Sequence, residues 1–309
     1  MIIVFGALNI DIIMSVSQFP ETGETVIADD YATRSGGKGS NQAMASTRAG
    51  AKTAMVGKVG DDAFGRRAMN NLKSQSVLGT GIGISERPTG CATIWVDENG
   101  QNKVLLSCGA NLDATADQIP DEILTERNPV LVQWEVPEEE TFMLIRRAAE
   151  RGARTILNAA PAVAEVPDDI LDMLDYLILN DIEAKQLAAH QGFTQKKMEA
   201  IAAEFAKRGQ LTCIITLGEK GVLAATPDRI LKMPALDVEV VDTTGAGDCF
   251  CGVFAAYLEQ RHDFVSALKA ASAAAALSCR VLGAQAGIPF DGEIDEYMGS
   301  LPDPEEITL

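Results

Sequence analysis

The amino-acid sequence predicts an α/β protein built on a mostly parallel β-sheet with a small additional β flap. Of its 309 residues, 47% are hydrophobic and 23% are charged, which is enough apolar material for one large α/β core or two modest ones. Short apolar runs alternate with helical patterns, as they do in β-α-β units. No repeat or Pro- or Ser-rich linker divides the chain, and we therefore expect one domain over residues 1–309.

The expected strands are short apolar runs bounded by polar or glycine-containing turns. The apolar N-terminus is expected to form a first buried strand within residues 1–14, although Asp11 interrupts it. Helical patterns separate the later strands, notably those at residues 138–152 and 194–209. The further strands are expected at residues 53–59, 130–134, 154–158, 175–180 and 211–216.

One stretch breaks this alternation. Residues 90–109 read as a strand, an Asp-Glu-Asn-Gly turn and a second strand, which is a hairpin signal. A second extended piece, residues 15–34, lies between the first strand and the first helix. Together they predict a small β flap over the mouth of the main sheet.

The composition excludes several classes of partner. Lys plus Arg number 26 against 44 Asp plus Glu, so the formal charge is −18, and such a surface repels nucleic-acid backbones and anionic membranes. No window offers the roughly 20 uninterrupted apolar residues of a membrane span, and the N-terminus lacks the pattern of a signal peptide. We expect a cytoplasmic protein that binds neither nucleic acid nor membrane. Its six cysteines show no metal-binding spacing and are expected to be reduced packing residues.

Three glycine-rich stretches are candidates for a phosphate-binding loop. Residues 35–43 fail as a Walker loop, because Lys38 is followed by Gly39 rather than Ser or Thr. Residues 79–83 follow a helix and open none, so a loop is expected there rather than a dinucleotide fingerprint. The third place is the junction between an expected strand at 237–241 and an expected amphipathic helix at 248–258.

That third junction is suited to holding an anion. Gly245, Ala246 and Gly247 allow consecutive backbone N–H groups to converge at a helix start, where the helix dipole also attracts negative charge. Asp248 falls in the first turn and can take a proton from an attacking hydroxyl group. The alternative interpretation is an Asp that is merely favoured near a helix N-terminus.

Polar residues also follow the expected strands, at the edge where open α/β sheets bind ligands. An early group offers acceptors and donors for a polyol, and a late group offers backbone amides and hydroxyls for a nucleotide. Each residue alone could equally be a cap or a turn residue. The early group is Asn9, Asp11, Gly36, Gly37, Lys38, Asn41 and Glu135, and the late group is Asn180, Glu183, Thr216 and Gly218.

Two long motifs, GGKGSNQA at 36–43 and VDTTGAGDCF at 241–250, resemble the signatures of the ribokinase branch of the phosphofructokinase-B-type carbohydrate kinases. Shorter motifs at 157–162, 180–184 and 216–221 are similar to that family in order and spacing. The resemblance covers nearly the whole chain. It implies a ribokinase-like three-layer α/β/α sandwich with a mostly parallel central sheet and a small β-sheet lid, formed by about 12–35 and 90–109.

The resemblance also implies roles for individual residues. Asp248 matches the base that deprotonates the sugar, and Gly245, Ala246 and Gly247 match the anion hole. The residues that match ribose contacts are Asn9, Asp11, Gly37, Lys38, Gly39, Asn41 and Glu135. The residues that match ATP contacts are Asn180, Thr216, Leu217, Gly218, Glu219, Lys220, Gly221, Gly247 and Ser272.

Two metal sites are implied in the same way. Glu183 matches the acidic residue that organises Mg²⁺ through water. The residues that match a K⁺-binding loop are Asp242, Thr244, Ser278, Val281, Gly283 and Gly287. The sequence departs from the family at Ser272, where some members carry His, and at Gly287, where some carry Ser. A homodimer formed through the lid is the implied assembly.

The expected reaction is in-line transfer of the γ-phosphoryl group of ATP to a primary hydroxyl, the 5-hydroxyl of D-ribose. Positioning, Mg²⁺ and the amide hole would supply most of the acceleration. Two alternatives stay open: a kinase of the same fold that acts on another sugar or a nucleoside, and a non-catalytic sensor of sugar or nucleotide. An intact Asp248 beside the glycine turn argues against the sensor, since a sensor needs no base.

Overall fold

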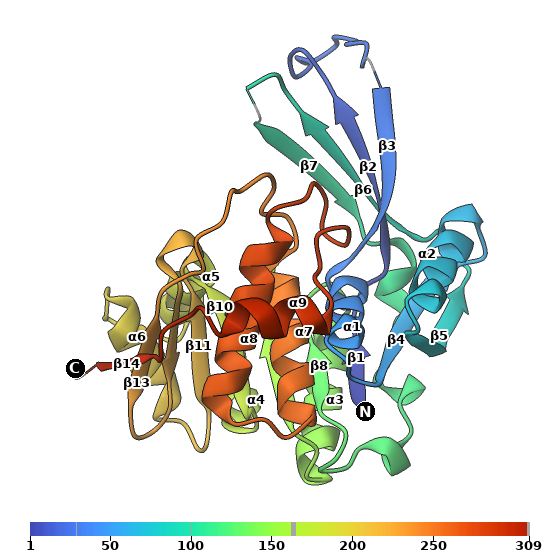
Figure 1. Ribbon diagram of the computed structural model, residues 1–309. Helices are drawn as coiled ribbons and strands as arrows, with labels where there is room; N and C mark the ends of the chain where they lie inside the picture. The colour runs from blue at the N-terminus through green and yellow to red at the C-terminus, as the bar shows by residue number, and fades with distance from the viewer. Residues whose placement is uncertain (29, 100, 162–164, 308–309) are drawn as a thin grey trace.

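The computed structural model describes residues 1–28, 30–99, 101–161 and 165–307, which form a layered body with a β-sheet lid standing on it (Figure 1). Residues 29 and 100 of the predicted lid, and residue 162 of the motif at 157–162, lie outside the described residues. Across the body sheet the strands follow in the order β14 (Glu305–Ile307), β13 (Ile230–Met233), β12 (Val222–Ala225), β11 (Thr212–Thr216), β10 (Tyr176–Asn180), β9 (Thr155–Asn158), β8 (Val130–Val132), β1 (Ile2–Phe5), β4 (Thr53–Gly60) and β5 (Leu78–Ser85). Neighbours from β11 to β5 run parallel, and the remaining edge is antiparallel. The strands predicted at 53–59, 130–134, 154–158, 175–180 and 211–216 and the mostly parallel sheet are confirmed.

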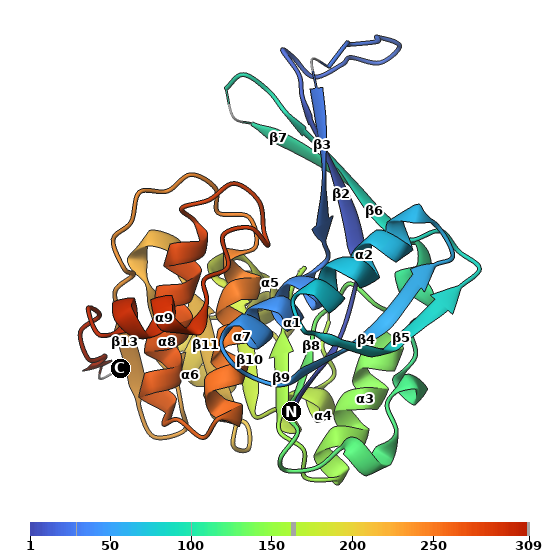
Figure 2. The same ribbon diagram turned by 45° about the vertical axis from the view of Figure 1, so that its right-hand side comes forward.

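Helices cover both faces of this sheet, so the body has three layers (Figure 2). Strand β1 shows why: Ile2 and Val4 belong to one buried cluster, whereas Ile3 and Phe5 belong to the other, because alternate side chains point to opposite faces. The first cluster packs under α1 (Lys38–Arg48), α2 (Ala63–Ser74), α7 (Ala246–Glu259), α8 (Phe264–Ser278) and α9 (Asp291–Met298). The second packs under α3 (Glu138–Glu150), α4 (Asp168–Asp172), α5 (Asp181–His190) and α6 (Met198–Ala206).

The lid is a separate sheet with the strand order β3 (Asp30–Gly36), β2 (Asn9–Ser15), β6 (Gly90–Val96) and β7 (Asn102–Ser107). Strands β6 and β7 form the predicted antiparallel hairpin, and β2 joins β6 in parallel. Asn9 pairs with both Gly36 and Gly90, so these three residues meet at the foot of the lid. Short 3-10 helices follow at η1 (Gly109–Asp113), η2 (Ala116–Gln118) and η3 (Asp121–Ile123), and η4 (Gly218–Lys220) follows β11.

The predicted first buried strand is confirmed as β1 at Ile2–Phe5, but the later part of residues 1–14 belongs to β2, so the N-terminus contributes to both sheets. After β1, the Gly6 N–H donates to the Val56 carbonyl at 3.1 Å, and the Leu8 N–H donates to the Asn111 side chain at 2.9 Å. The chain therefore leaves the body sheet after Phe5 and joins the lid sheet at Asn9. This crossing carries the residues after Phe5 from the core to the foot of the lid.

The structure corrects three further expectations. Residues 79–83 lie within strand β5 rather than in a loop; Gly81 packs so closely on Val56 that a Cβ there would lie 2.6 Å from the Val56 Cγ2. Residues 237–241 form no strand, and the Val241 N–H instead donates to the Cys279 carbonyl at 2.8 Å. Helix α7 is buried nearly all round instead of amphipathic, because it lies between α1 and α8. Within the described residues, no helix is long and apolar enough to cross a membrane.

Candidate active site

A small cavity of about 170 Å³ lies where the carboxyl ends of β9, β10 and β11 meet the N-termini of α1, α5 and α7. This is the edge at which open α/β sheets bind ligands. The cavity is lined by Lys38, Asn158, Ala160, Ile178, Leu179, Asn180, Glu183, Thr216, Gly245, Gly247, Asp248 and Cys251. Predicted residues from both the polyol group and the nucleotide group therefore share one cavity.

The start of α7 has the geometry of an anion site. Gly245 is the N-cap residue and has φ 78°, a left-handed conformation that favours glycine. The Ala246 N–H donates to the Thr243 carbonyl at 3.2 Å, whereas no protein acceptor in the described residues takes the N–H groups of Gly245 or Gly247. Of the three predicted amides, the two glycine amides are therefore the ones left for a ligand.

Asp248 lies in the first turn of α7, as predicted, and only 5% of it is exposed. Its two carboxylate oxygens accept hydrogen bonds from the Asn41 Nδ2 at 2.9 Å and the Gln42 Nε2 at 3.0 Å. Gln42 is fixed in turn by Gln133, whose Nε2 donates to its Oε1 at 2.6 Å, and by the Asn158 Oδ1 at 3.1 Å. Each carboxylate oxygen keeps a further lone pair, so the network orients Asp248 without removing its capacity to accept a proton.

Lys38 places a positive charge beside this carboxylate. The charge of Asp248 raises the pKa of Lys38 above its ordinary value, against the burial that lowers it, and Glu135 and Glu183 add to the rise. The backbone N–H of Lys38 donates to the Glu135 Oε2 at 2.9 Å, which fixes the first residue of α1. The cavity therefore holds a charged ammonium group next to the candidate base.

The sugar-side acids, Asp11 and Glu135, are half-buried. Burial, followed by the charge of Asp248, raises the pKa of Asp11 from 3.8 to about 6. Burial also raises the pKa of Glu135, although the N–H and the charge of Lys38 oppose it. Asn9 is 4% exposed, and its Oδ1 accepts from the Asn111 Nδ2 at 2.7 Å. Hydrogen bonds donated by the hydroxyl groups of a ligand would stabilise these carboxylates.

The glycines of the first motif let α1 approach the N-terminal crossover. Gly37 has φ 91° at the N-cap, and a Cβ there would lie 2.6 Å from the Ala7 carbonyl oxygen. At Gly39 a Cβ would lie 2.7 Å from the Gly6 carbonyl carbon. Larger residues at these positions would push α1 and Asn41 away from Asp248.

On the nucleotide side, Asn180 and Glu183 form a capping box at the start of α5. The Asn180 Oδ1 accepts the N–H of Glu183 at 2.8 Å, and the Glu183 Oε2 accepts the N–H of Asn180 at 2.8 Å. Burial raises the pKa of Glu183, although the Asn180 N–H and Lys38 oppose it. The capping box gives both residues a structural role at the start of α5. Both residues also line the cavity.

Of the remaining predicted nucleotide contacts, only Thr216 and Gly247 line the cavity. Residues 217–221 form the turn around η4, where 218–220 are exposed, and Thr216 alone of the motif at 216–221 reaches the cavity. Ser272, on α8, is 8% exposed, and its hydroxyl has no protein partner. A buried hydroxyl without a partner fits a place where a ligand supplies one.

The predicted cation loop is held together by Asp242. Its Oδ1 accepts the N–H of Thr244 at 2.9 Å, and its Oδ2 accepts the N–H of Gly283 at 2.8 Å. Burial tends to raise the pKa of Asp242, but these hydrogen bonds outweigh it and lower the pKa overall. Gly287 packs directly against the Ser278 carbonyl, and Val281 is 45% exposed. Asp242 thus joins the turn before α7 to the loop after α8.

Within the described residues, no group of three or more His, Cys, Asp or Glu side chains is arranged to hold a metal ion. Glu183 and Asp248 are the two carboxylates of the cavity. A divalent cation would therefore need ligands from water and from a bound phosphate, which Mg²⁺ prefers in any case.

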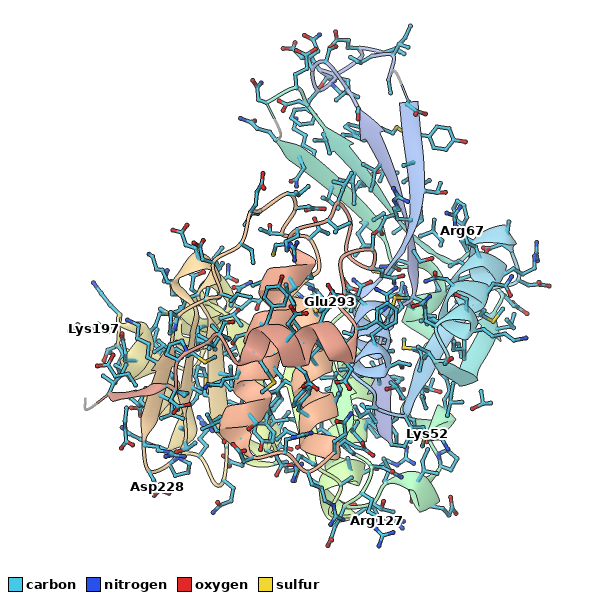
Figure 3. The ribbon with its side chains drawn as sticks, viewed as in Figure 1. Lys52, Arg67, Arg127, Lys197, Asp228 and Glu293 are labelled. Carbon is cyan, nitrogen blue, oxygen red and sulfur yellow. The ribbon has the colours of Figure 1, made fainter. Side chains whose placement is uncertain are left out.

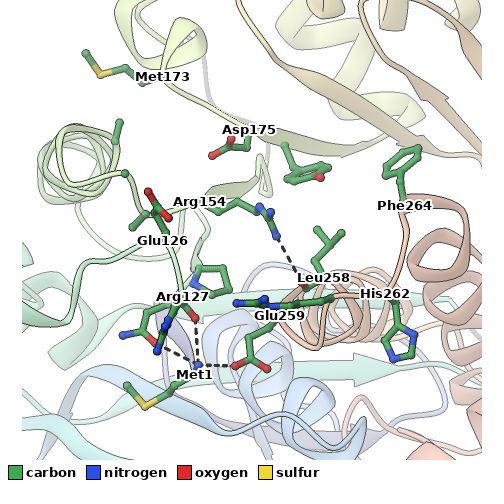
Figure 4. Close-up of a pocket in the computed structure, with 17 residues that line it drawn as sticks. Met1, Glu126, Arg127, Arg154, Met173, Asp175, Leu258, Glu259, His262 and Phe264 are labelled. Carbon is green, nitrogen blue, oxygen red and sulfur yellow. Dashed lines mark hydrogen bonds and ion pairs between the residues drawn. The ribbon is translucent and has the colours of Figure 1, made fainter.

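A larger hollow lies elsewhere. It has a volume of about 1070 Å³ and lies at the amino ends of β1, β8, β9 and β10, lined by Met1, Arg127, Arg154 and Glu259 among others (Figure 4). None of the predicted site residues lines it. In its lining the Met1 α-amino group lies 2.6 Å from the Glu259 Oε1, and the Arg154 Nη1 donates to the Leu258 carbonyl oxygen at 3.5 Å.

Sequence reasoning missed several buried amides that shape the site. Gln42 and Asn158 lie inside motifs that were already singled out, so their neighbours could have drawn attention to them. Gln285 lies in the loop at 281–287 and donates to the Asn41 Oδ1 at 2.9 Å. Asn111 and Gln133 follow no recognisable motif, and only the fold brings them near Asn9 and Gln42.

Comparisons with known proteins agree with this geometry. A family model described as pfkB family carbohydrate kinase matches residues 1–291. A ribokinase of Bacillus subtilis (strain 168) is 36% identical over 300 residues, covering 96% of this chain and 99% of that protein. A deoxyribokinase of Salmonella typhi is 34% identical over 300 residues, covering 96% and 98%.

Solved structures show the same similarity. The crystal structure of a ribokinase from Thermotoga maritima matches with a TM-score of 0.90 and 33% identity, covering 96% of this chain and 99% of that one. The ribokinase of Arabidopsis thaliana, solved with ribose and ATP, matches with a TM-score of 0.86 and 28% identity, covering 96% and 98%.

Proposed function

The chain belongs to the pfkB family of carbohydrate kinases, and we propose that it is a ribokinase, which transfers the γ-phosphoryl group of ATP to the 5-hydroxyl of D-ribose. The observation that carries the proposal is Asp248, a buried carboxylate in the first turn of α7, oriented by two amides beside free glycine N–H groups. Ribokinases at 33% and 36% identity over nearly their whole length support this activity.

In this proposal Asp248 accepts the proton of the sugar hydroxyl as its oxygen attacks the phosphoryl group. Asn41 and Gln42 hold the carboxylate in place, so little reorganisation is needed during the reaction. The transferring phosphoryl group carries its negative charge on three oxygens. The amides of Gly245 and Gly247 and the ammonium group of Lys38 are placed to stabilise that charge.

The sugar would bind between the foot of the lid and α1. Asn9 and Asp11 belong to β2, and Glu135 fixes the start of α1, so donors and acceptors surround that space on both sides. Gly37, Gly39 and Asn41 complete the proposed sugar contacts. Closure of the lid over the sugar would exclude water, which otherwise competes as the phosphoryl acceptor.

ATP would lie along the ends of β10 and β11, with its γ-phosphoryl group in the small cavity. Its proposed contacts are Asn180, the turn from Thr216 to Gly221, Gly247 and the unpartnered hydroxyl of Ser272. The ATP complex of the similar Arabidopsis enzyme supports use of this nucleotide. We propose that Mg²⁺ enters with the phosphates and is held through water by Glu183.

A monovalent cation, K⁺, is proposed to bind at the loop that Asp242 holds together. Carboxylate and carbonyl oxygens suit a large, weakly hydrated cation, and the residues proposed to hold it are Asp242, Thr244, Ser278, Val281, Gly283 and Gly287. The cation would not touch the substrate. It would steady the turn that leads to Gly245.

We also propose a homodimer formed through the lid. Strand β7 is exposed along its whole length. In the lid, Leu105 is 71% exposed, Tyr31 is 66% exposed and Ile27 is 86% exposed. Exposed apolar side chains gathered in this way are typical of a surface that a partner covers.

If the lid pairs with a second copy, Leu105→Lys will shift the protein from dimer to monomer in analytical ultracentrifugation, whereas the exposed control Lys52→Glu, far from the lid (Figure 3), will not. An unchanged mass for Leu105→Lys would place any dimer contact elsewhere.

We also make proposals about the cellular location of the protein and about its domain boundaries. We propose that the enzyme works in the cytoplasm, where ATP is available and thiols stay reduced; all six cysteines are free. We further propose that residues 1–309 act as one kinase domain, since the lid is formed from two separate segments of the chain that both return to the body.

The deciding experiment is a coupled assay of ADP release with D-ribose, 2-deoxy-D-ribose, hexoses and nucleosides. The highest kcat/KM is expected for D-ribose. The deoxyribokinase at 34% identity makes 2-deoxy-D-ribose the sharpest competitor. A clear preference for another sugar or a nucleoside would reassign the substrate, and no turnover with any acceptor, despite binding, would support a sensor.

A further inference from the structure

A continuous row of side-chain amides connects helix α2 to Asp248. The Asn71 Nδ2 donates to the Gln285 Oε1 at 2.7 Å. The Gln285 Nε2 donates to the Asn41 Oδ1 at 2.9 Å, and the Asn41 Nδ2 donates to the Asp248 Oδ2 at 2.9 Å. Helices α1, α2 and α7 and the loop at 281–287 thus meet in one row of hydrogen bonds.

The charge of the carboxylate sets the direction of this row. An ionised carboxylate only accepts, so Asn41 must turn its NH₂ group toward Asp248. Its oxygen then faces Gln285 and needs a donor, which only the NH₂ end of Gln285 supplies. The Gln285 oxygen in turn accepts from Asn71. If Gln285 could not donate, Asn41 would lose the contact that keeps its NH₂ group on the carboxylate.

Gln285 is itself held firmly by its backbone and by a second side-chain contact. The Arg48 Nη1 donates to the Gln285 carbonyl at 3.0 Å and to the Ile288 carbonyl at 2.7 Å. The Arg48 guanidinium also lies 4.8 Å from the centre of the Phe290 ring. The Gln285 Nε2 makes a further hydrogen bond to the Ser40 Oγ at 3.1 Å. Within the described residues Arg48 forms no ion pair; its Nη1 serves the loop, and its Nε donates to the Gln75 Oε1 at 3.0 Å.

The same loop also contacts the other half of the catalytic apparatus. A Cβ at Gly245 would lie 2.7 Å from the Ala284 Cβ, so the residue before Gln285 packs on the first residue of the amide hole. Gly283, one residue earlier, donates to Asp242. Consecutive residues of one loop therefore contact the cation site, the amide hole and, through Asn41, the base.

We propose that Gln285 is a positioning residue for the phosphoryl transfer: it orients Asn41, and thereby the base Asp248, and Asn71 orients Gln285. This inference rests on the proposed kinase activity. Gln285 makes none of the proposed substrate contacts itself, but Asn41 is a proposed sugar contact, so we expect Gln285 to affect kcat and the KM for the sugar and to leave the KM for ATP unchanged. The loop would hold the base and the amide hole in a fixed relation, which in-line transfer requires.

Helix α2 gives this row a fixed support. Arg67, one helical turn before Asn71, donates to the Thr33 carbonyl of β3 at 2.8 Å, and Figure 3 shows it beside the foot of the lid. The helix that orients Gln285 is therefore also attached to the lid. Asn70 and Asn71 both line a hollow of about 460 Å³ that Gln285 also borders. Asn70 makes no hydrogen bond to the row, which makes it a matched control.

The test measures kcat and both KM values for Gln285→Met, Asn71→Leu and the double variant. Met keeps the length of Gln but can neither donate to Asn41 nor accept from Asn71. We expect Gln285→Met to lower kcat by roughly ten- to a hundredfold, since small displacements of a reacting group cost that much. The KM for ATP should change less than twofold. Asn71→Leu should lower kcat by about threefold, and the double variant should be no slower than Gln285→Met, because Asn71 acts through Gln285.

Control variants separate positioning from general damage. Asn70→Leu should keep the wild-type kcat, and Gln285→Glu, which keeps the shape but cannot donate, should reproduce the loss in kcat seen with Met. A purely structural role would lower the melting temperature and the active fraction, while active-site titration would show an unchanged kcat per folded site; that result would overturn the proposal. Full multiplication of the two single effects in the double variant would also contradict it.

Asp248→Asn, measured in parallel, distinguishes failure of this inference from failure of the proposed function. If Asp248→Asn is inactive while Gln285→Met turns over like the wild type, Gln285 is not a positioning residue but the kinase proposal stands. If Asp248→Asn keeps its activity, the base itself is misassigned and the inference falls with it.

Discussion

The two ends of the parallel sheet differ in how their polar groups are arranged. At the carboxyl end, a cavity of about 170 Å³ is bordered by a carboxylate that is 5% exposed and held by two amides. At the amino end, a hollow of about 1070 Å³ is lined by arginines such as Arg127, which is exposed, and Arg154, which is partly exposed (Figure 4). The candidate catalytic groups line the smaller cavity. Catalysis depends on how reacting groups are oriented, and a larger volume does not provide that orientation.

The reason lies in desolvation. A polar group withdrawn from water costs free energy unless partners replace the water, so a buried carboxylate persists only where the fold supplies donors. Asp248 has such donors in Asn41 and Gln42. At the amino end, Arg127 is exposed to water, and Arg154 is partly exposed with one long hydrogen bond to the Leu258 carbonyl. The comparison predicts that changes at the carboxyl end alter turnover, whereas changes at the amino end alter only stability.

The largest effect is expected for Asp248→Asn. The amide keeps the shape of the side chain but cannot accept the proton, so kcat should fall by about 10²–10⁴-fold. Calorimetry should show ATP and ribose binding within about tenfold of the wild type. Arg154→Gln at the amino end should leave kcat unchanged. A similar loss in both variants would remove the distinction between the two ends.

Asp11→Ala should weaken ribose binding far more than ATP binding. A hydrogen bond to a charged group contributes roughly 1.5–3 kcal/mol, so the Kd for ribose should rise by ten- to a hundredfold or more. Isothermal titration with each ligand separately measures both constants. Equal losses for ribose and ATP would place Asp11 outside the sugar pocket.

Asp242→Ala should lower kcat by about tenfold and remove activation by K⁺, because the turn before Gly245 loses its link to Gly283. The measurement compares K⁺ with tetramethylammonium at matched ionic strength and saturating Mg²⁺. Wild-type enzyme that is equally active in both cations would show that Asp242 serves only to hold the turn.

The buried acid also predicts a pH dependence of stability. The pKa of Asp11 is about 6 in the folded protein and 3.8 ordinarily, so the folded state binds the proton more tightly. The resulting stabilisation is complete below pH 4 and is lost as the pH rises through 6. Asp11→Asn should therefore raise the free energy of unfolding at pH 7.5, by on the order of 2 kcal/mol, and the gain over wild type should disappear below pH 4. Denaturant titrations of the sugar-free protein at several pH values test this, and a gain that is independent of pH would contradict it.

The smallest effect is expected at the amino end. The α-amino group of Met1 lies 2.6 Å from the Glu259 Oε1, and both are partly exposed. Glu259→Gln should lower the free energy of unfolding by about 1 kcal/mol or less, as such pairs do. The kcat and both KM values should stay at wild-type levels. A changed kcat in this variant would mean that the amino end takes part in turnover.

Much of the fold could be predicted because its signals are local. Short continuous apolar runs mark β4, β9, β10 and β11, and the Asp-Glu-Asn-Gly turn marks the β6–β7 hairpin. The errors arose where a local pattern met a tertiary constraint. Residues 237–241 have strand propensity, but the Val241 N–H pairs with the Cys279 carbonyl after α8, and β5 carries Gly81 where Val56 leaves no room for a side chain.

For the site, the sequence by itself determined which groups are proposed to carry the chemistry. Asp248 after the Gly245 turn, the glycines of the first motif and the Asn180–Glu183 capping box are all set by backbone conformation over a few residues. Such conformations depend on neighbouring residues, so spacing along the chain reveals them.

Only the tertiary structure decided how these groups are oriented. The donors to Asp248 come from a helix some 200 residues earlier, and their own orientation depends on Gln133 and Gln285, which no motif distinguishes from other amides. An amide gains a defined role only when burial removes water and leaves one partner for each of its ends. That condition depends on which elements pack together, and packing is a property of the whole chain.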